Sequence, residues 1–332
     1  LEIEFGESQI TLKNELGMEV DIINLGATVS SIRFPVNGKM KEMTATYKNI
    51  QDFTTDTFYI GATVGRFANR IANAQFSIDD KTFSIIANLN GHCLHGGSDG
   101  FSHRFWHVER QNNESVVLVL ISPDGDQGFP GELTLKVTYT LTENNSLDVI
   151  YHATSTKDTA VNFCNHCYFN LGEKDISTLS LKIKSREVLA VNDSLIPTGE
   201  KLSVDKTDFD FNERVAISER LANLSHEMLV KSQAFDHCYV IDGDINQVAA
   251  ELSSNEVNLT IKTDLPGLQF CTPSFLSGEF SPFQALCLEA QNYPDAINQP
   301  TFPNAILRVG EEHQSRVRFI FSENQSHQQL SH

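Results

Sequence analysis

Residues 133–151 read LTLKVTYTLTENNSLDVIY, and this stretch decides the fold class. Its first nine residues alternate strictly, with an apolar side chain at every odd position and threonine or lysine between them. Successive side chains of a β-strand point to opposite faces of its sheet, so this period predicts a strand with one buried and one exposed face. Two asparagines at positions 144 and 145 favour a turn, after which the alternation resumes at Leu147, Val149 and Tyr151.

The same alternation recurs along the chain, at residues 179–183, 257–261 and 317–321. Residues 76–86 read as a hairpin, because two β-prone runs flank a short polar turn. Only residues 216–230 carry apolar side chains at three- to four-residue spacing, which predicts one short helix in a connection. Many strands, regular turns and almost no helix predict an all-β sandwich or barrel.

The chain of 332 residues shows no internal repeat and no linker. All-β folds of this kind can exceed the usual domain size, so we expect a single domain over residues 1–321. Residues 322–332 are polar, and we expect them to form a disordered tail.

Acidic residues outnumber basic ones by a wide margin. The chain carries 43 Asp and Glu against 25 Lys and Arg, which gives a net charge of −18 at pH 7. Such a surface repels the phosphate backbone of nucleic acids and the headgroups of anionic lipids, so we expect neither as a partner. A neutral small ligand is compatible with this charge.

Six cysteines are few for this length and show no disulfide-dense framework. We therefore expect reduced, mostly buried thiols. No stretch reaches the roughly 18 apolar residues of a membrane span, and no basic segment followed by an apolar one opens the chain. These observations favour a cytoplasmic protein that has no membrane partner.

A glycine-rich stretch at residues 61–106 predicts a surface on which a ligand comes close to the backbone. Within it, Asn69, Arg70 and His95 supply an amide, a guanidinium and an imidazole group. Together these groups offer the donors and acceptors that suit a ligand with several hydroxyl groups.

Five motifs, in this order along the chain, resemble the signatures of the aldose 1-epimerases, also called galactose mutarotases. They are RFANR at 66–70, LHGG at 94–97, CNHCYFNL at 164–171, FDH at 235–237 and LEAQNYPDAINQP at 288–300. The resemblance extends from about Gly26 to Phe321. It implies the large two-sheet antiparallel β-sandwich of the galactose mutarotase-like type. It also implies interconversion of the α and β anomers of a free hexose such as galactose or glucose, without metal or cofactor, by a monomer or homodimer.

The resemblance assigns the acid and the base to two residues. By itself, a histidine in a strand is more often a structural residue, and a glutamate at a strand end is often simply solvated. The resemblance reverses both readings, with His166 as the general acid and Glu289 as the general base. Histidine can exchange a proton near neutral pH, and a carboxylate takes a proton from a sugar hydroxyl when the two are in hydrogen-bond contact.

Five residues are expected to hold the remaining sugar oxygens. Asp236 and Gln269 match sugar-binding positions of the family, beside Asn69, Arg70 and His95 in the glycine-rich stretch. An aspartate before an apolar strand would otherwise read as a turn or cap residue. Downstream of Gln269 the sequence departs from the family, because Cys271 and Pro273 stand where tyrosine and glycine are expected.

Cys164 and Cys167 form a C-x-x-C pair, which elsewhere marks redox chemistry or half of a zinc site. Here the segment reads as a strand, in which residues three apart point to opposite faces. We therefore expect the two sulfurs not to meet and neither a redox nor a metal role for the pair. Both stand where the family usually has small polar residues.

Three alternatives remain open at this point. An epimerase for hexose 6-phosphates would need clustered Arg or Lys, for which only Arg70 and Arg66 are candidates. A non-catalytic sugar-binding protein is compatible with the fold alone, although the presence of both His166 and Glu289 argues against it. A glycoside hydrolase using Glu289 with Asp236 would need two carboxylates at a set separation, which the sequence does not measure.

Overall fold

The computed structural model describes residues 9–230 and 232–324. The predicted pair of strands is present as β12 (Leu133–Leu141) and β13 (Ser146–Ser155), which pair antiparallel with Leu141 opposite Leu147. Every odd-numbered residue of β12 is buried and every even-numbered one is partly exposed. The prediction of a strand with one buried face is confirmed.

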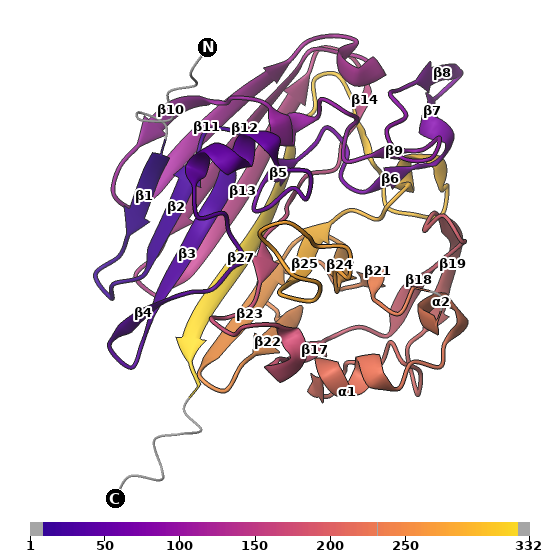
Figure 1. Ribbon diagram of the computed structural model, residues 1–332. Helices are drawn as coiled ribbons and strands as arrows, with labels where there is room; N and C mark the ends of the chain where they lie inside the picture. Colours follow the sequence, from indigo (N-terminus) through magenta and orange to yellow (C-terminus); the bar gives the residue numbers. More distant parts are fainter. Residues whose placement is uncertain (1–8, 231, 325–332) are drawn as a thin grey trace, which may run out of the picture.

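These two strands lie near the middle of a nine-stranded antiparallel sheet (Figure 1). In spatial order the sheet consists of β10 (His107–Gln111), β11 (Ser115–Ser122), β12, β13, β27 (His313–Glu323), β23 (Val257–Thr263), β22 (Ala250–Ser253), β17 (Ser180–Ile183) and β20 (Val215–Ala216). The stretches predicted as strands from their alternation at 179–183, 257–261 and 317–321 form β17, β23 and β27. The fold-class prediction is confirmed.

The last strand is longer than predicted. Its ladder continues through Ser322 opposite Asn258 to Glu323 opposite Val257, because backbone pairing does not need apolar side chains. The start of the polar tail, predicted at residue 322, is therefore placed too early. Residues 325–332 of the predicted tail lie outside the described residues.

The second layer of the sandwich consists of two sheets. A four-stranded sheet contains β1 (Gln9–Lys13), β2 (Glu19–Ile23), β3 (Thr28–Val36) and β4 (Lys39–Glu42). A six-stranded sheet has the order β16 (Tyr168–Phe169), β25 (Leu286–Gln291), β24 (Gly267–Cys271), β21 (Asp236–Val240), β18 (Glu187–Val191) and β19 (Pro197–Ser203). A bridge between Thr44 and Phe169 joins the two sheets.

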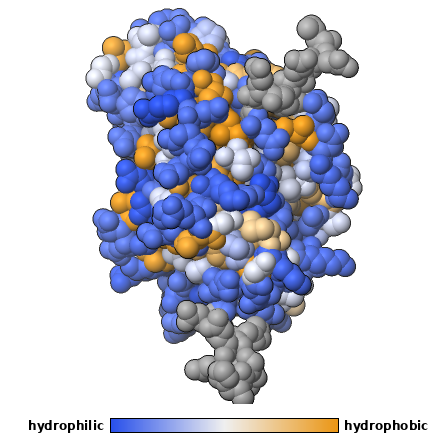
Figure 2. All heavy atoms as spheres, turned by 90° about the vertical axis from the view of Figure 1, so that its left-hand side faces the viewer, coloured by the Kyte–Doolittle hydropathy of each residue, from blue (hydrophilic) through white to orange (hydrophobic). Residues whose placement is uncertain are grey.

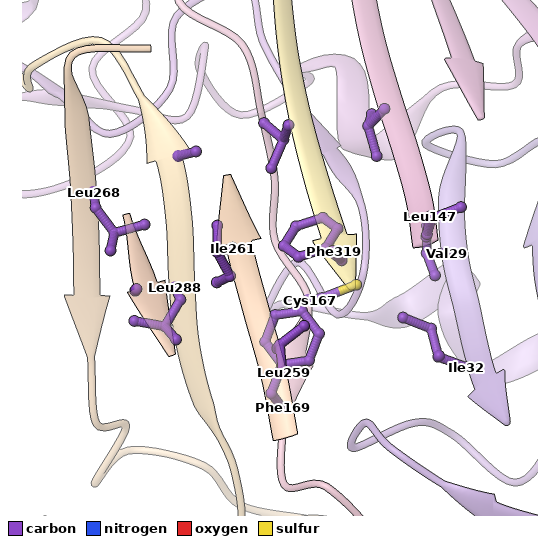
Figure 3. Close-up of a cluster of buried hydrophobic side chains, with 14 of the residues drawn as sticks. Val29, Ile32, Leu147, Cys167, Phe169, Leu259, Ile261, Leu268, Leu288 and Phe319 are labelled. Carbon is purple, nitrogen blue, oxygen red and sulfur yellow. The ribbon is translucent and has the colours of Figure 1, made fainter. Parts of the chain in front are cut away.

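The main hydrophobic core lies between the layers (Figure 3). Leu259, Ile261 and Phe319 of the nine-stranded sheet belong to the same buried cluster as Leu268 and Leu288 of the six-stranded sheet. Burying each such side chain contributes about 1.5–3 kcal/mol. Since the even-numbered residues of β24 and β25 enter this core, their odd-numbered residues must point to the opposite face of the six-stranded sheet.

Short strands and turns pack over that opposite face. The strands are β5 (Thr63–Val64) with β15 (Cys164–Asn165), β6 (Arg70–Ile71) with β9 (Cys93–Leu94), β7 (Gln75–Ile78) with β8 (Lys81–Ser84), and β14 (Thr159–Ala160) with β26 (Ile306–Leu307). A second buried cluster contains Phe67, Ile71 and Phe76 from these segments and Leu189 and Cys238 from the six-stranded sheet. The hairpin predicted at 76–86 is confirmed as β7 and β8.

Six short 3₁₀-helices complete the described chain, at Ile50–Thr55, Ala72–Ala74, Phe101–His103, Asp126–Gly128, Ile176–Thr178 and Ala296–Asn298. Within the described residues, no helix is both long and apolar enough to cross a membrane. The face shown in Figure 2, on the side of β1–β4 in Figure 1, is mostly hydrophilic, and its apolar residues are scattered, as expected for a solvated outer face.

The single helix predicted for residues 216–230 is wrong, because two shorter helices form, α1 (Ile217–Ala222) and α2 (Glu227–Val230). The Asp208 carboxylate accepts hydrogen bonds from the backbone N–H of Ser225 at 2.5 Å and of His226 at 2.6 Å. These groups bind a distant side chain instead of continuing a helix, so a tertiary contact overrides the local periodicity.

The buried side chain of Arg66 ties the covering segments to the nine-stranded sheet. It is 2% exposed and donates to the carbonyl oxygens of Pro130 at 2.8 Å and Gly131 at 3.0 Å. It also donates to Ser122 Oγ at 2.6 Å and Thr159 Oγ1 at 3.2 Å. Burial lowers the pKa of Arg66 to about 10, so the side chain remains charged at pH 7.

We predict that Arg66→Met lowers the free energy of unfolding by about 2–4 kcal/mol, because it leaves several buried acceptors without a donor. Arg308→Met is the control. Arg308 pairs with Asp79 and Asp158, but its side chain is 37% exposed. Urea denaturation of both variants checks the prediction, and an equal loss of stability in the two would contradict it.

Candidate active site

Three strands of the six-stranded sheet supply the floor of the candidate site. Gln269 on β24 lies directly opposite Glu289 on β25, and Asp236 on β21 lies directly opposite Cys271 on β24. Side chains directly opposite each other on paired strands have Cβ atoms about 5 Å apart. The sheet register therefore brings together three residues that lie up to 53 positions apart in the sequence.

His166 faces Glu289 from the short connection between β15 and β16. Its backbone is held on both sides, since its N–H donates to the carbonyl of Ala62 at 2.9 Å and its carbonyl accepts from Gly61 N–H at 3.0 Å. The imidazole Nε2 lies 3.6 Å from Glu289 Oε2, and the two side chains are 8% and 3% exposed. The predicted acid and base are thus brought together.

The Asn69 and His95 segments hold each other in place through two hydrogen bonds, one to a side chain and one between backbone groups. Asn69 N–H donates to His95 Nδ1 at 3.1 Å, and His95 N–H donates to the Asn69 carbonyl at 3.0 Å. Because Nδ1 accepts and burial lowers the pKa of His95 well below its usual value, the ring is neutral and carries its proton on Nε2. Both residues have positive φ, 62° and 50°, a strained conformation found where geometry is tightly determined.

Arg70, Asp236 and Gln269 form a second polar group beside the acid–base pair. Arg70 Nη1 lies 3.5 Å from Asp236 Oδ2, and Gln269 Nε2 donates to Asp236 Oδ1 at 2.6 Å. The Gln269 amide is oriented by this bond, which leaves its buried Oε1 without a partner among the described residues. Asp236 and Arg70 have side chains that are 29% and 11% exposed, so solvent reaches the cluster from their side.

Two further residues lie at the site that were not predicted from the sequence. The Tyr59 ring lies with its centroid 4.6 Å from that of His95 and 5.8 Å from that of His166. Cys287 Sγ lies 3.7 Å from Nδ1 of His166. Cys287 precedes Glu289 by two positions on a strand, so the period of two could have placed it on the same face. Tyr59 lies in a loop, and no sequence pattern places it.

Burial shifts the pKa values of His166 and Glu289 in opposite directions. Loss of solvent lowers the pKa of His166 to about 4 and raises that of Glu289 to about 8, the latter with a contribution from the Asp236 charge. Between these values the pair holds one proton, which resides on the carboxyl group of Glu289 in the absence of a ligand. Such a pair titrates as a unit.

Comparisons with known proteins all indicate one family. Residues 8–319 match the family model described as aldose 1-epimerase. The chain is 36% identical to the aldose 1-epimerase of Escherichia coli over 329 residues, with 94% of each chain covered. It is 34% identical to the human galactose mutarotase over 320 residues, covering 92% of this chain and 91% of the relative.

This chain belongs to the aldose 1-epimerase family.

Solved structures of the family have the same fold as this member. An aldose epimerase homologue from C. elegans superposes with a TM-score of 0.89 at 30% identity, over 95% of this chain and 98% of that one. Galactose 1-epimerase from Lactobacillus acidophilus gives 0.87 at 28% identity, over 95% and 94%. The predicted family and the mutarotase-like sandwich are confirmed.

The two cysteines of the C-x-x-C pair have different surroundings, although the segment forms two two-residue strands with a connection between them instead of the single strand predicted. Cys164 Sγ lies 3.5 Å from Glu289 Oε2, whereas Cys167 belongs to the main hydrophobic core with Phe169 (Figure 3). All six cysteines are free and buried. Cys271, the departure noted beside Gln269, is buried on the same sheet face as Asp236 and lies opposite Cys287.

Three side chains of the site could hold a metal ion. Ligand atoms of His166, Cys287 and Glu289 all lie within 4.8 Å of one another. Imidazole, thiolate and carboxylate together suit zinc. These side chains include the predicted acid and base, so an ion here would occupy the groups that exchange protons.

Proposed function

We propose that this protein is an aldose 1-epimerase that interconverts the α and β anomers of a free aldohexose, with galactose and glucose as the first candidates. The observation that carries the proposal is the buried pair of His166 and Glu289, whose nearest nitrogen and oxygen are 3.6 Å apart. The pair is surrounded by donors and acceptors suited to hydroxyl groups. Relatives at 34–36% identity bear the names of aldose 1-epimerase and galactose mutarotase.

In the proposed mechanism, Glu289 removes the proton from the C1 hydroxyl and His166 protonates the ring oxygen. The C1–O5 bond breaks, C1 becomes an aldehyde, and the open chain carries a hydroxyl at C5. Rotation about C1–C2 presents the other face of the carbonyl. On closure Glu289 returns its proton to the carbonyl oxygen, and His166 takes the proton of the C5 hydroxyl as that oxygen attacks C1. No proton or electron is gained or lost overall.

The protonation state of the free pair matches the open-chain stage of this cycle. After ring opening, Glu289 is protonated and His166 is neutral, the state that burial favours without a ligand. A bound cyclic sugar must therefore stabilise the alternative state, in which the proton lies on His166. Sugar hydroxyls that donate to the Glu289 carboxylate supply that stabilisation, because hydrogen bonds to the charged form favour it.

The remaining predicted residues are proposed to orient the sugar. His95 Nε2 and the amide of Asn69 offer donors, and the unpartnered Oε1 of Gln269 offers an acceptor. Arg70 Nη1 and Asp236 Oδ2 lie 3.5 Å apart. The guanidinium is proposed to donate a hydrogen bond to one sugar hydroxyl, and the carboxylate to accept one from a neighbouring hydroxyl. Such positioning lowers the entropic part of the barrier.

The contacts of Arg66 and Arg70 favour a free sugar over a sugar phosphate as the substrate. Of the two arginines considered for a phosphate site, Arg66 is buried against Pro130, Gly131 and Ser122, and Arg70 is shared with Asp236. We further propose a single domain without metal or cofactor, located in the cytoplasm, acting as a monomer or homodimer. The acidic net charge of −18 supports a role without nucleic acid.

We predict that His166→Ala and Glu289→Gln each lower kcat at least about 100-fold, since each removes one proton-transfer group. Polarimetry of freshly dissolved α-galactose and α-glucose, corrected for the spontaneous rate, checks this. Asn298→Ala, which changes an exposed residue of the 3₁₀-helix after β25, is the control. A near-native rate in either pair variant, with the fold intact, would remove that residue from the mechanism.

We predict that kcat/KM is constant between about pH 4 and pH 8, where the pair holds one proton. Above about pH 8 the last proton leaves and no acid remains, so kcat/KM falls about tenfold per pH unit. Below about pH 4 a second proton binds and no base remains. A fall in kcat/KM that begins near pH 6.5, the ordinary histidine pKa of about 6.5, would contradict the description of a pair that shares one proton.

We predict that kcat/KM for glucose 6-phosphate is at least about tenfold lower than for glucose, a difference of about 1.4 kcal/mol. The phosphate ester carries close to two negative charges near neutral pH and approaches a protein of net charge −18. Coupled assays at fixed ionic strength compare the two sugars. An equal or higher kcat/KM for glucose 6-phosphate would contradict the proposed free hexose and favour a sugar phosphate as the substrate.

A further inference from the structure

Two thiol groups flank the acid–base pair, and the proposed mechanism uses neither. Cys287 Sγ lies 3.7 Å from Nδ1 of His166, and Cys164 Sγ lies 3.5 Å from Oε2 of Glu289. Both cysteines are 0% exposed. Burial raises the pKa of both thiols, so neither is a reactive nucleophile by itself.

Cys287, His166 and Glu289 present one sulfur, one nitrogen and one oxygen ligand within 4.8 Å of one another. Zinc binds these atoms at about 2.0–2.3 Å, which in a tetrahedral site places them roughly 3.3–3.8 Å apart. Glu289 already approaches His166 at 3.6 Å, although through Nε2, whereas Cys287 approaches Nδ1 at 3.7 Å. An ion bound at one ring nitrogen therefore requires the third side chain, whose ligand atom lies within 4.8 Å of the other two, to move closer.

We propose that Cys287, His166 and Glu289 form an inhibitory site for a thiophilic divalent cation such as Zn²⁺, with Cys164 beside it as a second thiol. The regulatory part of this proposal rests on the proposed function, because the ion would occupy the acid and the base. The binding part depends only on the three ligand atoms. The site differs from a cofactor site in that the cation blocks the reaction instead of supporting it.

Binding exchanges protons for the metal. Zn²⁺ displaces the proton of the Cys287 thiol and the proton that the pair holds on Glu289, and both are released to solvent as Zn–S and Zn–O bonds form. No oxidant or reductant takes part. His166 ligates through a ring nitrogen that carries no proton. A sugar that hydrogen-bonds to Glu289 competes with the ion for the same carboxylate.

The test begins with binding, which does not depend on activity. The reduced protein is dialysed against EDTA and then against metal-free buffer, and Zn²⁺ is titrated by calorimetry in two buffers that differ in protonation enthalpy. Co²⁺ provides a second probe, since thiolate ligation gives a charge-transfer band in the near ultraviolet. We expect one high-affinity equivalent, proton release and the thiolate band. Cys287→Ala should lower the affinity at least tenfold and remove the band.

Cys238→Ala is the matched control, because Cys238 is also buried on the six-stranded sheet but belongs to the second hydrophobic cluster. It should bind Zn²⁺ as the unaltered protein does. Glu289→Gln, which changes one atom of the side chain, provides a second ligand variant if Cys287→Ala does not fold. Equal binding by Cys287→Ala and Cys238→Ala, or no high-affinity equivalent in the unaltered protein, would overturn the site.

Activity assays then test inhibition. Micromolar Zn²⁺ should abolish epimerisation, Mg²⁺ should not because it prefers oxygen ligands, and excess EDTA should restore the rate. EDTA alone should leave the rate unchanged. Zinc that activates the EDTA-treated protein would overturn the inhibitory role. Zinc binding in a protein without epimerase activity would refute the proposed function while leaving the metal site in place.

Discussion

The pairing of β24 with β25 is the constraint on which the rest of the site depends. In each strand the even-numbered side chains, such as Leu268 and Leu288, enter the main core, and the odd-numbered ones, such as Gln269 and Glu289, are left on the other face. The apolar burial that holds the sandwich together therefore also fixes the carboxylate and its neighbouring amide. A slip of one residue in register would exchange the two sets and place a glutamate in the core.

Loss of water from the site is the second physical factor that determines its chemistry. The covering segments bury His166 and Glu289, and the loss of water disfavours the charged form of each, which moves the two pKa values apart in opposite directions. The result is a pair that holds one proton over several pH units, as an acid–base catalyst of a neutral sugar requires. The same burial raises the pKa of the Cys164 and Cys287 thiols, because the loss of water disfavours their thiolate forms as well.

The covering segments are held by polar contacts more than by their own secondary structure. Strands β5, β6, β9 and β15 have two residues each, so their positions depend on contacts elsewhere. Arg66 binds loops of the nine-stranded sheet, and Asn69 and His95 bind each other in strained backbone conformations. The glycines of this stretch have a direct steric role: a Cβ on Gly96 would lie 2.1 Å from the carbonyl oxygen of Gly65.

The sequence by itself determined the all-β class, most of the long strands and the hairpin at β7 and β8, because a period of two is a local property of the chain. Its motifs also supplied the seven residues proposed for the candidate site, since those residues occur in recognisable local contexts. The prediction of one helix over residues 216–230 was wrong because the carboxylate of a distant residue, Asp208, accepts a hydrogen bond from the backbone N–H of Ser225, which therefore does not continue the helix. Only the tertiary structure decided that Glu289 faces His166 at 3.6 Å, that Tyr59 and Cys287 adjoin them, and that Arg66 is structural. These relations depend on sheet register and on burial, which arise from contacts between residues far apart in the chain, and no local pattern encodes them.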